Sequence, residues 1–164
     1  MSDIAFETSW RRLQDKGHRH IADAIYREIF GDVKIIRVDE ATIGYAESKA
    51  LDILGVDFHV CFANQTRLSG QEKYLSFSER GFRTVTVSEH SWKHCAAQIY
   101  FVGYLTENGQ GFDPWVIMNW PAVMLATARR EIAWGFRRSR GPYASFWFAS
   151  MDILPPSCLI ASSL

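Results

Sequence analysis

The stretch Gly55–Tyr74, GVDFHVCFANQTRLSGQEKY, decides the fold that we expect for this chain. Apolar side chains alternate with other residues over 56–62, and this period of two predicts a β-strand. Residues 63–69 then have the composition of a turn, and residues 70–77 read as a returning strand. The two segments together predict a β-hairpin.

Polar residues occupy related positions on the two predicted strands. Side chains on a strand alternate between faces, so Gln71 and Lys73 share one face and Glu72 points to the other. If the strands pair as a hairpin, Asp57 lies near Gln71 and Lys73. The hairpin is therefore expected to gather one carboxylate, one amide and one ammonium group.

These groups suit hydrolysis of a phosphodiester. A carboxylate can bind a divalent ion that polarises a phosphoryl oxygen and lowers the pKa of a bound water. Hard oxygen ligands favour Mg²⁺ or Mn²⁺. A lysine beside the ion, here Lys73, orients the water or stabilises the charge that develops on the phosphate. The backbone carbonyl of Glu72 is a further expected metal ligand, because it can face the site although its side chain does not.

This arrangement resembles the PD-(D/E)xK nuclease superfamily, in which an Asp on one strand and an acid-x-Lys on the next form the metal site. The first part matches at Asp57, and Gln71-Glu72-Lys73 matches the second with Gln in place of the acid. That substitution resembles a Gln-x-Lys branch that includes some phage and repair nucleases. The resemblance covers residues 46–105, and the rest of the chain follows it only in element order.

The resemblance implies a restriction-endonuclease-like core, in which helices flank a mixed central sheet. It also implies a Mg²⁺- or Mn²⁺-dependent deoxyribonuclease, with DNA as the partner and Asp57, Gln71 and Lys73 as catalytic residues. Whether such an enzyme would cut within strands or from their ends, and whether it would form a homodimer, is left open.

The sequence departs from the superfamily pattern in ways that affect the metal. No proline precedes Asp57, and Gln71 is neutral, so a second carboxylate must come from elsewhere. Asp52 is the first choice because it lies five residues before Asp57. Glu47 is the second choice, and Asp23 on the first predicted helix is the third.

The rest of the chain predicts alternating helices and strands. Helices are expected up to residue 30, over 91–97 and over 121–136; strands over 33–38, 83–87, 98–105 and 115–119; an edge strand over 145–149; and a loop or short helix over 40–54. The order predicts a mixed α/β (α+β) fold with helices packed on a sheet. The whole length, 1–164, is expected to form a single domain.

Arginines gather around the end of the predicted helix over 121–136. They are expected to contact DNA phosphates. The alternative is a solvated helix end, where cations complement the helix dipole. The residues concerned are Arg129, Arg130, Arg137, Arg138 and Arg140.

Composition bounds the remaining choices. The formal net charge is zero, so bulk charge gives no sign of nucleic-acid binding, which would need a local patch. Three widely spaced cysteines favour reduced thiols. No apolar signal-peptide core and no long apolar run are present, so we expect a cytoplasmic protein without a membrane partner.

A second reading belongs to another class of protein. The neutral Gln71 also fits a catalytically degenerate member that binds nucleic acid or a protein partner of a mobile element without cleaving it.

Overall fold

The computed structural model describes residues 15–39, 43–138 and 145–164. In this part of the chain the helices are α2 (Lys16–Phe30), α4 (Tyr45–Ile53), α5 (Glu89–His94) and α6 (Trp120–Ala128). The strands are β1 (Lys34–Arg37), β2 (Phe58–Cys61), β3 (Arg67–Leu75), β4 (Thr84–Ser88), β5 (Ile99–Leu105), β6 (Phe112–Asn119), β7 (Gly135–Arg137), β8 (Phe146–Ser150) and β9 (Leu159–Ser162). Short 3₁₀ turns are η1 (Phe77–Phe82), η2 (Met151–Ile153) and η3 (Pro156–Cys158).

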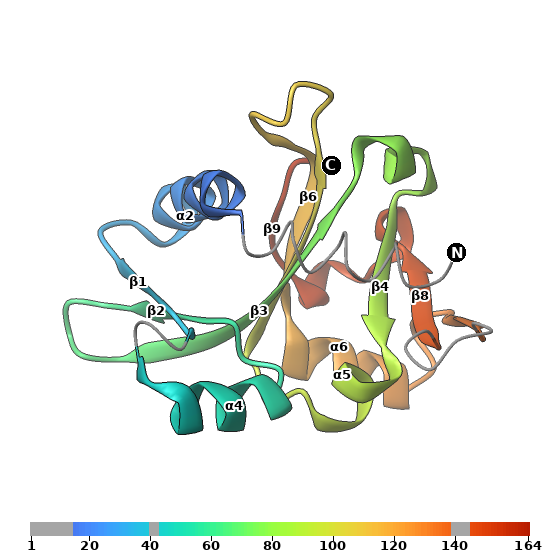
Figure 1. Ribbon diagram of the computed structural model, residues 1–164. Helices are drawn as coiled ribbons and strands as arrows, with labels where there is room; N and C mark the ends of the chain where they lie inside the picture. Colours follow the sequence, from blue (N-terminus) through green and yellow to red (C-terminus); the bar gives the residue numbers. More distant parts are fainter. Residues whose placement is uncertain (1–14, 40–42, 139–144) are drawn as a thin grey trace.

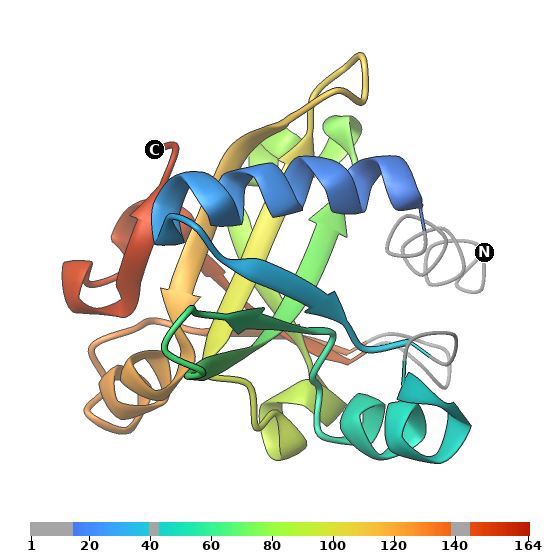
Figure 2. The same ribbon diagram turned by 90° about the vertical axis from the view of Figure 1, so that its left-hand side faces the viewer.

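The strands form two sheets. The larger has six strands in the order β1-β2-β3-β5-β6-β9, and the smaller has three in the order β4-β8-β7. Strands β3 and β5 run parallel, whereas the other neighbours in the large sheet are antiparallel. The prediction of a mixed α/β (α+β) fold, with helices flanking a mixed central sheet, is confirmed (Figures 1 and 2).

The large sheet separates two hydrophobic cores. Helix α2 lies across one face (Figure 2) and packs through Tyr26 on Phe58 and Phe101. The opposite face carries Tyr100 and Val102, and it is covered by the small sheet and α6 (Figure 1). Any side chain on β3 therefore points either toward α2 or toward the small sheet.

A glycine sets the register between β2 and β3. Gly70 lies opposite Phe58, and a Cβ built on Gly70 would lie 2.1 Å from Cζ of the Phe58 ring. Only glycine therefore allows the ring to lie over β3, where Tyr26 stacks on it with 4.6 Å between ring centroids. In this register the N–H of Asp57 donates to the Gly70 carbonyl at 2.8 Å, which places Asp57 beside Gln71.

The helix predicted over 121–136 is wrong in its second half. Helix α6 ends at Ala128, and Arg130 adopts a φ of 60° that turns the chain away. Trp134 then folds back and donates its indole N–H to the Thr127 hydroxyl at 2.9 Å. Gly135 begins strand β7. The apolar residues whose spacing predicted a helix therefore lie in a turn and a strand.

Two further strand predictions differ from the structure in their place. The strand predicted over 83–87 is β4, but it belongs to the small sheet rather than to the central one. The edge strand predicted over 145–149 is β8, which is the middle strand of that sheet. Strands β4 and β8 pair with each other although they are far apart in sequence, and local sequence patterns do not predict such pairing. No helix among the described residues is long and apolar enough to cross a membrane.

Candidate active site

Asp57, Gln71 and Lys73 lie on one side of the hairpin, as predicted. Asp57 immediately precedes β2, and it is hydrogen-bonded to β3 on either side of Gln71: its N–H donates to the Gly70 carbonyl and its Oδ2 accepts from the Glu72 N–H, each at 2.8 Å. Lys73 follows two residues later on β3, on the same face as Leu75, which belongs to the core beneath the small sheet. Glu72 points to the other face, also as predicted.

Asp57 is a partly buried acid in a negative environment. Burial, and after it the carboxylates of Glu72 and Asp52, raise the pKa of its carboxyl to about 7. The backbone N–H of Glu72 donates to Asp57 Oδ2 at 2.8 Å and opposes this rise, as does the charge of Arg37. The surroundings therefore supply too little positive charge to hold Asp57 fully ionised at neutral pH.

Lys73 is perturbed in the opposite direction. Burial lowers the pKa of its ammonium group to about 8, and the carboxylate of Glu79 partly offsets this effect. An acid with a raised pKa and an amine with a lowered pKa lie on the same side of the hairpin. They mark a candidate functional site, because burial shifts both pKa values toward neutrality.

The amide of Gln71 is held by α5 and the residue that follows it. Its Nε2 donates to the Ser91 hydroxyl at 3.0 Å, and the Cys95 thiol donates to its Oε1 at 3.1 Å. Gly55 leaves room for this amide, since a Cβ there would lie 3.3 Å from Oε1. One amide hydrogen and one oxygen lone pair remain for a water or an ion. The predicted role of Gln71 stays a prediction.

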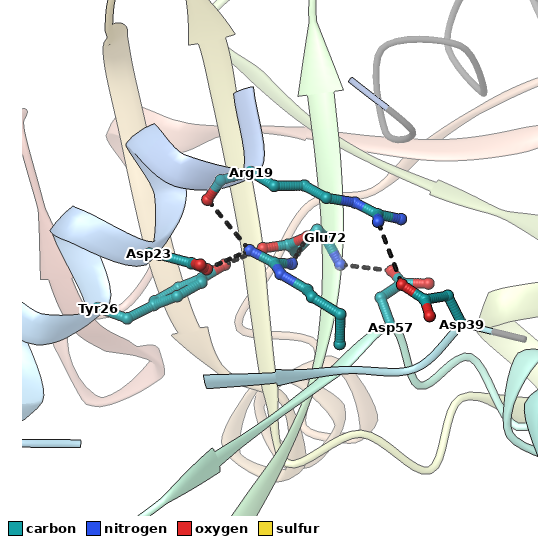
Figure 3. A network of polar contacts seen from close by, with 7 residues as sticks. Arg19, Asp23, Tyr26, Asp39, Asp57 and Glu72 are labelled. Atoms are coloured by element: carbon teal, nitrogen blue, oxygen red, sulfur yellow. Dashed lines mark hydrogen bonds and ion pairs between the residues drawn. The ribbon is translucent and has the colours of Figure 1, made fainter. Parts of the chain in front are cut away.

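The side chain of Glu72 belongs to a buried network on the α2 face. Its Oε1 accepts from the Tyr26 hydroxyl at 2.7 Å, and its Oε2 forms an ion pair with Arg37. Arg37 also pairs with Asp23 and lies over the Phe58 ring. Figure 3 shows this network and its link to Asp57 through the Glu72 N–H.

The backbone of Glu72 points toward Asp57. Its N–H is directed to the β2 side, and the N–H and C=O groups of one strand residue point the same way. The carbonyl predicted as a metal ligand is therefore on the side of the Asp57 carboxylate. Only the backbone of Glu72 is available, since its carboxylate is paired with Arg37.

The three choices for a second carboxylate lie in different places. Asp52 is near the end of α4, and its charge reaches Asp57, where it raises the pKa. Glu47 is in the first turn of α4, and its charge acts on His59. Asp23 is paired with Arg37 in the network on the α2 face. Asp52 is the choice that this geometry favours.

A magnesium ion fits this donor set better than a zinc ion does. No group of three or more His, Cys, Asp or Glu side chains that could hold a metal is found in the described part of the chain. Mg²⁺ commonly keeps several waters and takes only one or two protein carboxylates. The pKa of Asp57 is raised mainly by burial, and a bound cation would favour its ionised form.

The predicted arginine cluster is divided between two elements. Arg129 and Arg130 follow α6, whereas Arg137 ends β7 and Arg138 follows it. These four side chains are exposed. Arg140 lies outside the described residues.

Comparisons with known proteins give no further information about the function of this site. No family model, curated protein or solved structure matches the chain. The assignment to a function therefore depends on the site itself.

Sequence reasoning missed the residues that hold the site in place. Ser91 and Cys95 bind Gln71 from 20 and 24 positions away, and no local pattern predicts such contacts. Arg37 gave a usable signal, because a charged residue that ends an apolar strand needs a partner. Its partner, Glu72, was already expected to point away from the hairpin site.

Proposed function

We propose that this protein hydrolyses phosphodiester bonds of DNA in a metal-dependent reaction, as a PD-(D/E)xK-type nuclease with a restriction-endonuclease-like core. The observation that carries the proposal is the placement of Asp57 beside Gln71, held by hydrogen bonds to Gly70 and Glu72, with Lys73 two residues further along β3. Burial shifts the pKa values of Asp57 and Lys73 toward neutrality, which is in keeping with the proposal.

Each residue has a defined role in this proposal. Asp57 and Asp52, with the Glu72 carbonyl, would hold Mg²⁺ or Mn²⁺, which would polarise the phosphate and acidify a bound water. Lys73 is mostly protonated at pH 7, because its pKa is about 8, and its ammonium group stabilises negative charge on the phosphate. Gln71 orients the attacking water through its remaining amide hydrogen and lone pair.

Cleavage of plasmid and branched DNA with Mg²⁺ tests the proposal. Lys73→Ala is expected to lower the rate by about 100-fold or more, the usual effect of removing one group that stabilises a developing charge. Lys34→Ala is the matched control, because Lys34 is an exposed lysine on the nearby strand β1. Equal rates for the wild type and Lys73→Ala would remove the assignment.

A second function is favoured by one observation. Both ends of the Gln71 amide already have partners inside the protein, as expected of a site that no longer needs this side chain for chemistry. Such a protein would bind nucleic acid or a protein partner without cleaving it. Calorimetric titration with Mg²⁺ distinguishes the two, since a nuclease takes up the ion through Asp57 and a binding module does not.

A further inference from the structure

A cavity of about 310 Å³ lies between the small sheet and the end of β3, and none of the roles above uses it. Its lining is largely aromatic and apolar, with a few polar groups. The lining residues come from the small sheet, the end of β3, β5 and η1.

One wall of the cavity is a single face of the small sheet. Thr86 lies opposite Phe148, and Arg137 lies opposite Phe146, so these four side chains share that face. The ring of Phe148 packs on the backbone of β7, because a Cβ at Gly135 would lie 2.3 Å from its Cζ. The glycine therefore fixes an aromatic ring in the wall.

The other wall adjoins the candidate active site. Leu75 follows Lys73 by two residues on the same face of β3, which is a spacing of about 7 Å along a strand. Glu79 lines the cavity and also acts on the Lys73 ammonium group. A molecule in the cavity would thus contact Leu75, two positions along β3 from Lys73.

The polar groups around the cavity include a cation without an ion-pair partner among the described residues. Arg137 is exposed and makes no ion pair within the described part of the chain, so its charge is available to an anion.

We propose that this cavity binds an unpaired base of a DNA strand beside the hydrolytic site, an inference that rests on the proposed function for the identity of the polymer. The aromatic rings of the lining stack on the base. Arg137 neutralises a neighbouring phosphate. An apolar ligand would make no use of the Arg137 charge, whereas a nucleotide combines a flat ring with a negative charge.

Binding of fluorescent oligonucleotides, measured by anisotropy in the presence of a chelator, separates base recognition from cleavage. The probes are a single-stranded oligonucleotide, the same strand with abasic sites, and its duplex. The wild type is expected to bind the base-containing single strand most tightly. Equal affinity for the abasic strand, or no binding of any probe, overturns the inference.

Two exposed phenylalanines provide a variant and its control. Phe82 lines the cavity and is 72% exposed, so Phe82→Ala removes a stacking ring without disturbing the core. We expect it to weaken binding of the single strand by about 5- to 100-fold and to abolish the preference over the abasic strand. Phe136 is also exposed, but it packs on Trp147 from the opposite face of the small sheet. Equal affinities of Phe82→Ala and Phe136→Ala would overturn the inference.

The failure of this inference differs from the failure of the proposed function. Base-dependent binding without Mg²⁺-dependent cleavage would reject the nuclease and retain the cavity as a base site. Cleavage that depends on Lys73, without any preference for base-containing over abasic strands, would retain the nuclease and reject the base site.

Discussion

Asp57 has a carboxyl group in surroundings that disfavour its ionised form. Its pKa of about 7 lies well above the ordinary value of 3.8 for an aspartate, mainly because the carboxyl is buried. A carboxyl whose pKa is raised on folding stabilises the folded state fully only below its unfolded pKa, and this stabilisation is lost as the pH rises through 7. The ionised form of Asp57 is therefore a cost to the metal-free protein.

Asp57→Asn should remove this cost and keep the hydrogen bond, since an amide oxygen can still accept from the Glu72 N–H. Without metal, we expect the variant to be more stable than the wild type by about 2 kcal/mol at pH 8, with a smaller difference at pH 4. Thermal unfolding at both pH values measures this. The same difference at both pH values would contradict the raised pKa.

Magnesium should reverse the order of stability. An ion that binds only the folded protein raises its free energy of unfolding, and it needs the ionised carboxylate. We expect added Mg²⁺ to raise the melting temperature of the wild type at pH 8 and to leave Asp57→Asn unchanged. A similar rise in both proteins would show that Asp57 does not bind the ion.

Among the elements, the β2–β3 hairpin is the one that sequence predicted best. Alternation over 56–62 and the turn that follows were sufficient, because hairpin partners are near neighbours in sequence. The same reasoning placed Asp57, Gln71 and Lys73 on one side. It did not explain why this register is preferred, which depends on the fit of the Phe58 ring over Gly70.

Gly70→Ala tests that register. The added Cβ would collide with the Phe58 ring, which Tyr26 holds from the other side, so we expect a loss of about 1–3 kcal/mol or more in urea unfolding. Gly81→Ala is the control, because a Cβ at Gly81 meets nothing within 4 Å. Similar stabilities of the two variants would show that the ring does not set the register.

The elements that sequence misplaced are those decided by distant contacts. Helix α6 stops early because Trp134 returns to Thr127 and because β7 pairs with β8. Strand β4 joins β8, which lies more than 55 residues further along the chain. Apolar periodicity predicts that a segment is buried, but it does not predict which other segment of the chain packs on it.

At the scale of the whole molecule, a buried ion pair joins α2 to the large sheet. Arg37 on β1 contacts Glu72 on β3 and Asp23 on α2, and its side chain is 13% exposed. Glu72 is 2% exposed and also holds Tyr26 of α2. Three segments far apart in sequence thus meet at one guanidinium group.

Arg37→Met should destabilise the protein by about 3–5 kcal/mol, because it leaves the buried Glu72 carboxylate without its cation. Arg83→Met is the matched control, since Arg83 pairs with Asp152 at the surface, where solvent screens the pair and it contributes little to stability. Chemical unfolding of both variants decides the point. A loss no larger in Arg37→Met than in Arg83→Met would mean that the network does not join α2 to the sheet.

The parallel pairing of β3 with β5 has a consequence for the order of assembly. Parallel neighbours need a crossover, and this one carries η1, β4 and α5. β4 then has no partner until β8 has been made, near the other end of the chain. During synthesis the strands beside Asp57 and Lys73 can therefore pair first, while the aromatic wall beside them closes only after β8 has been made.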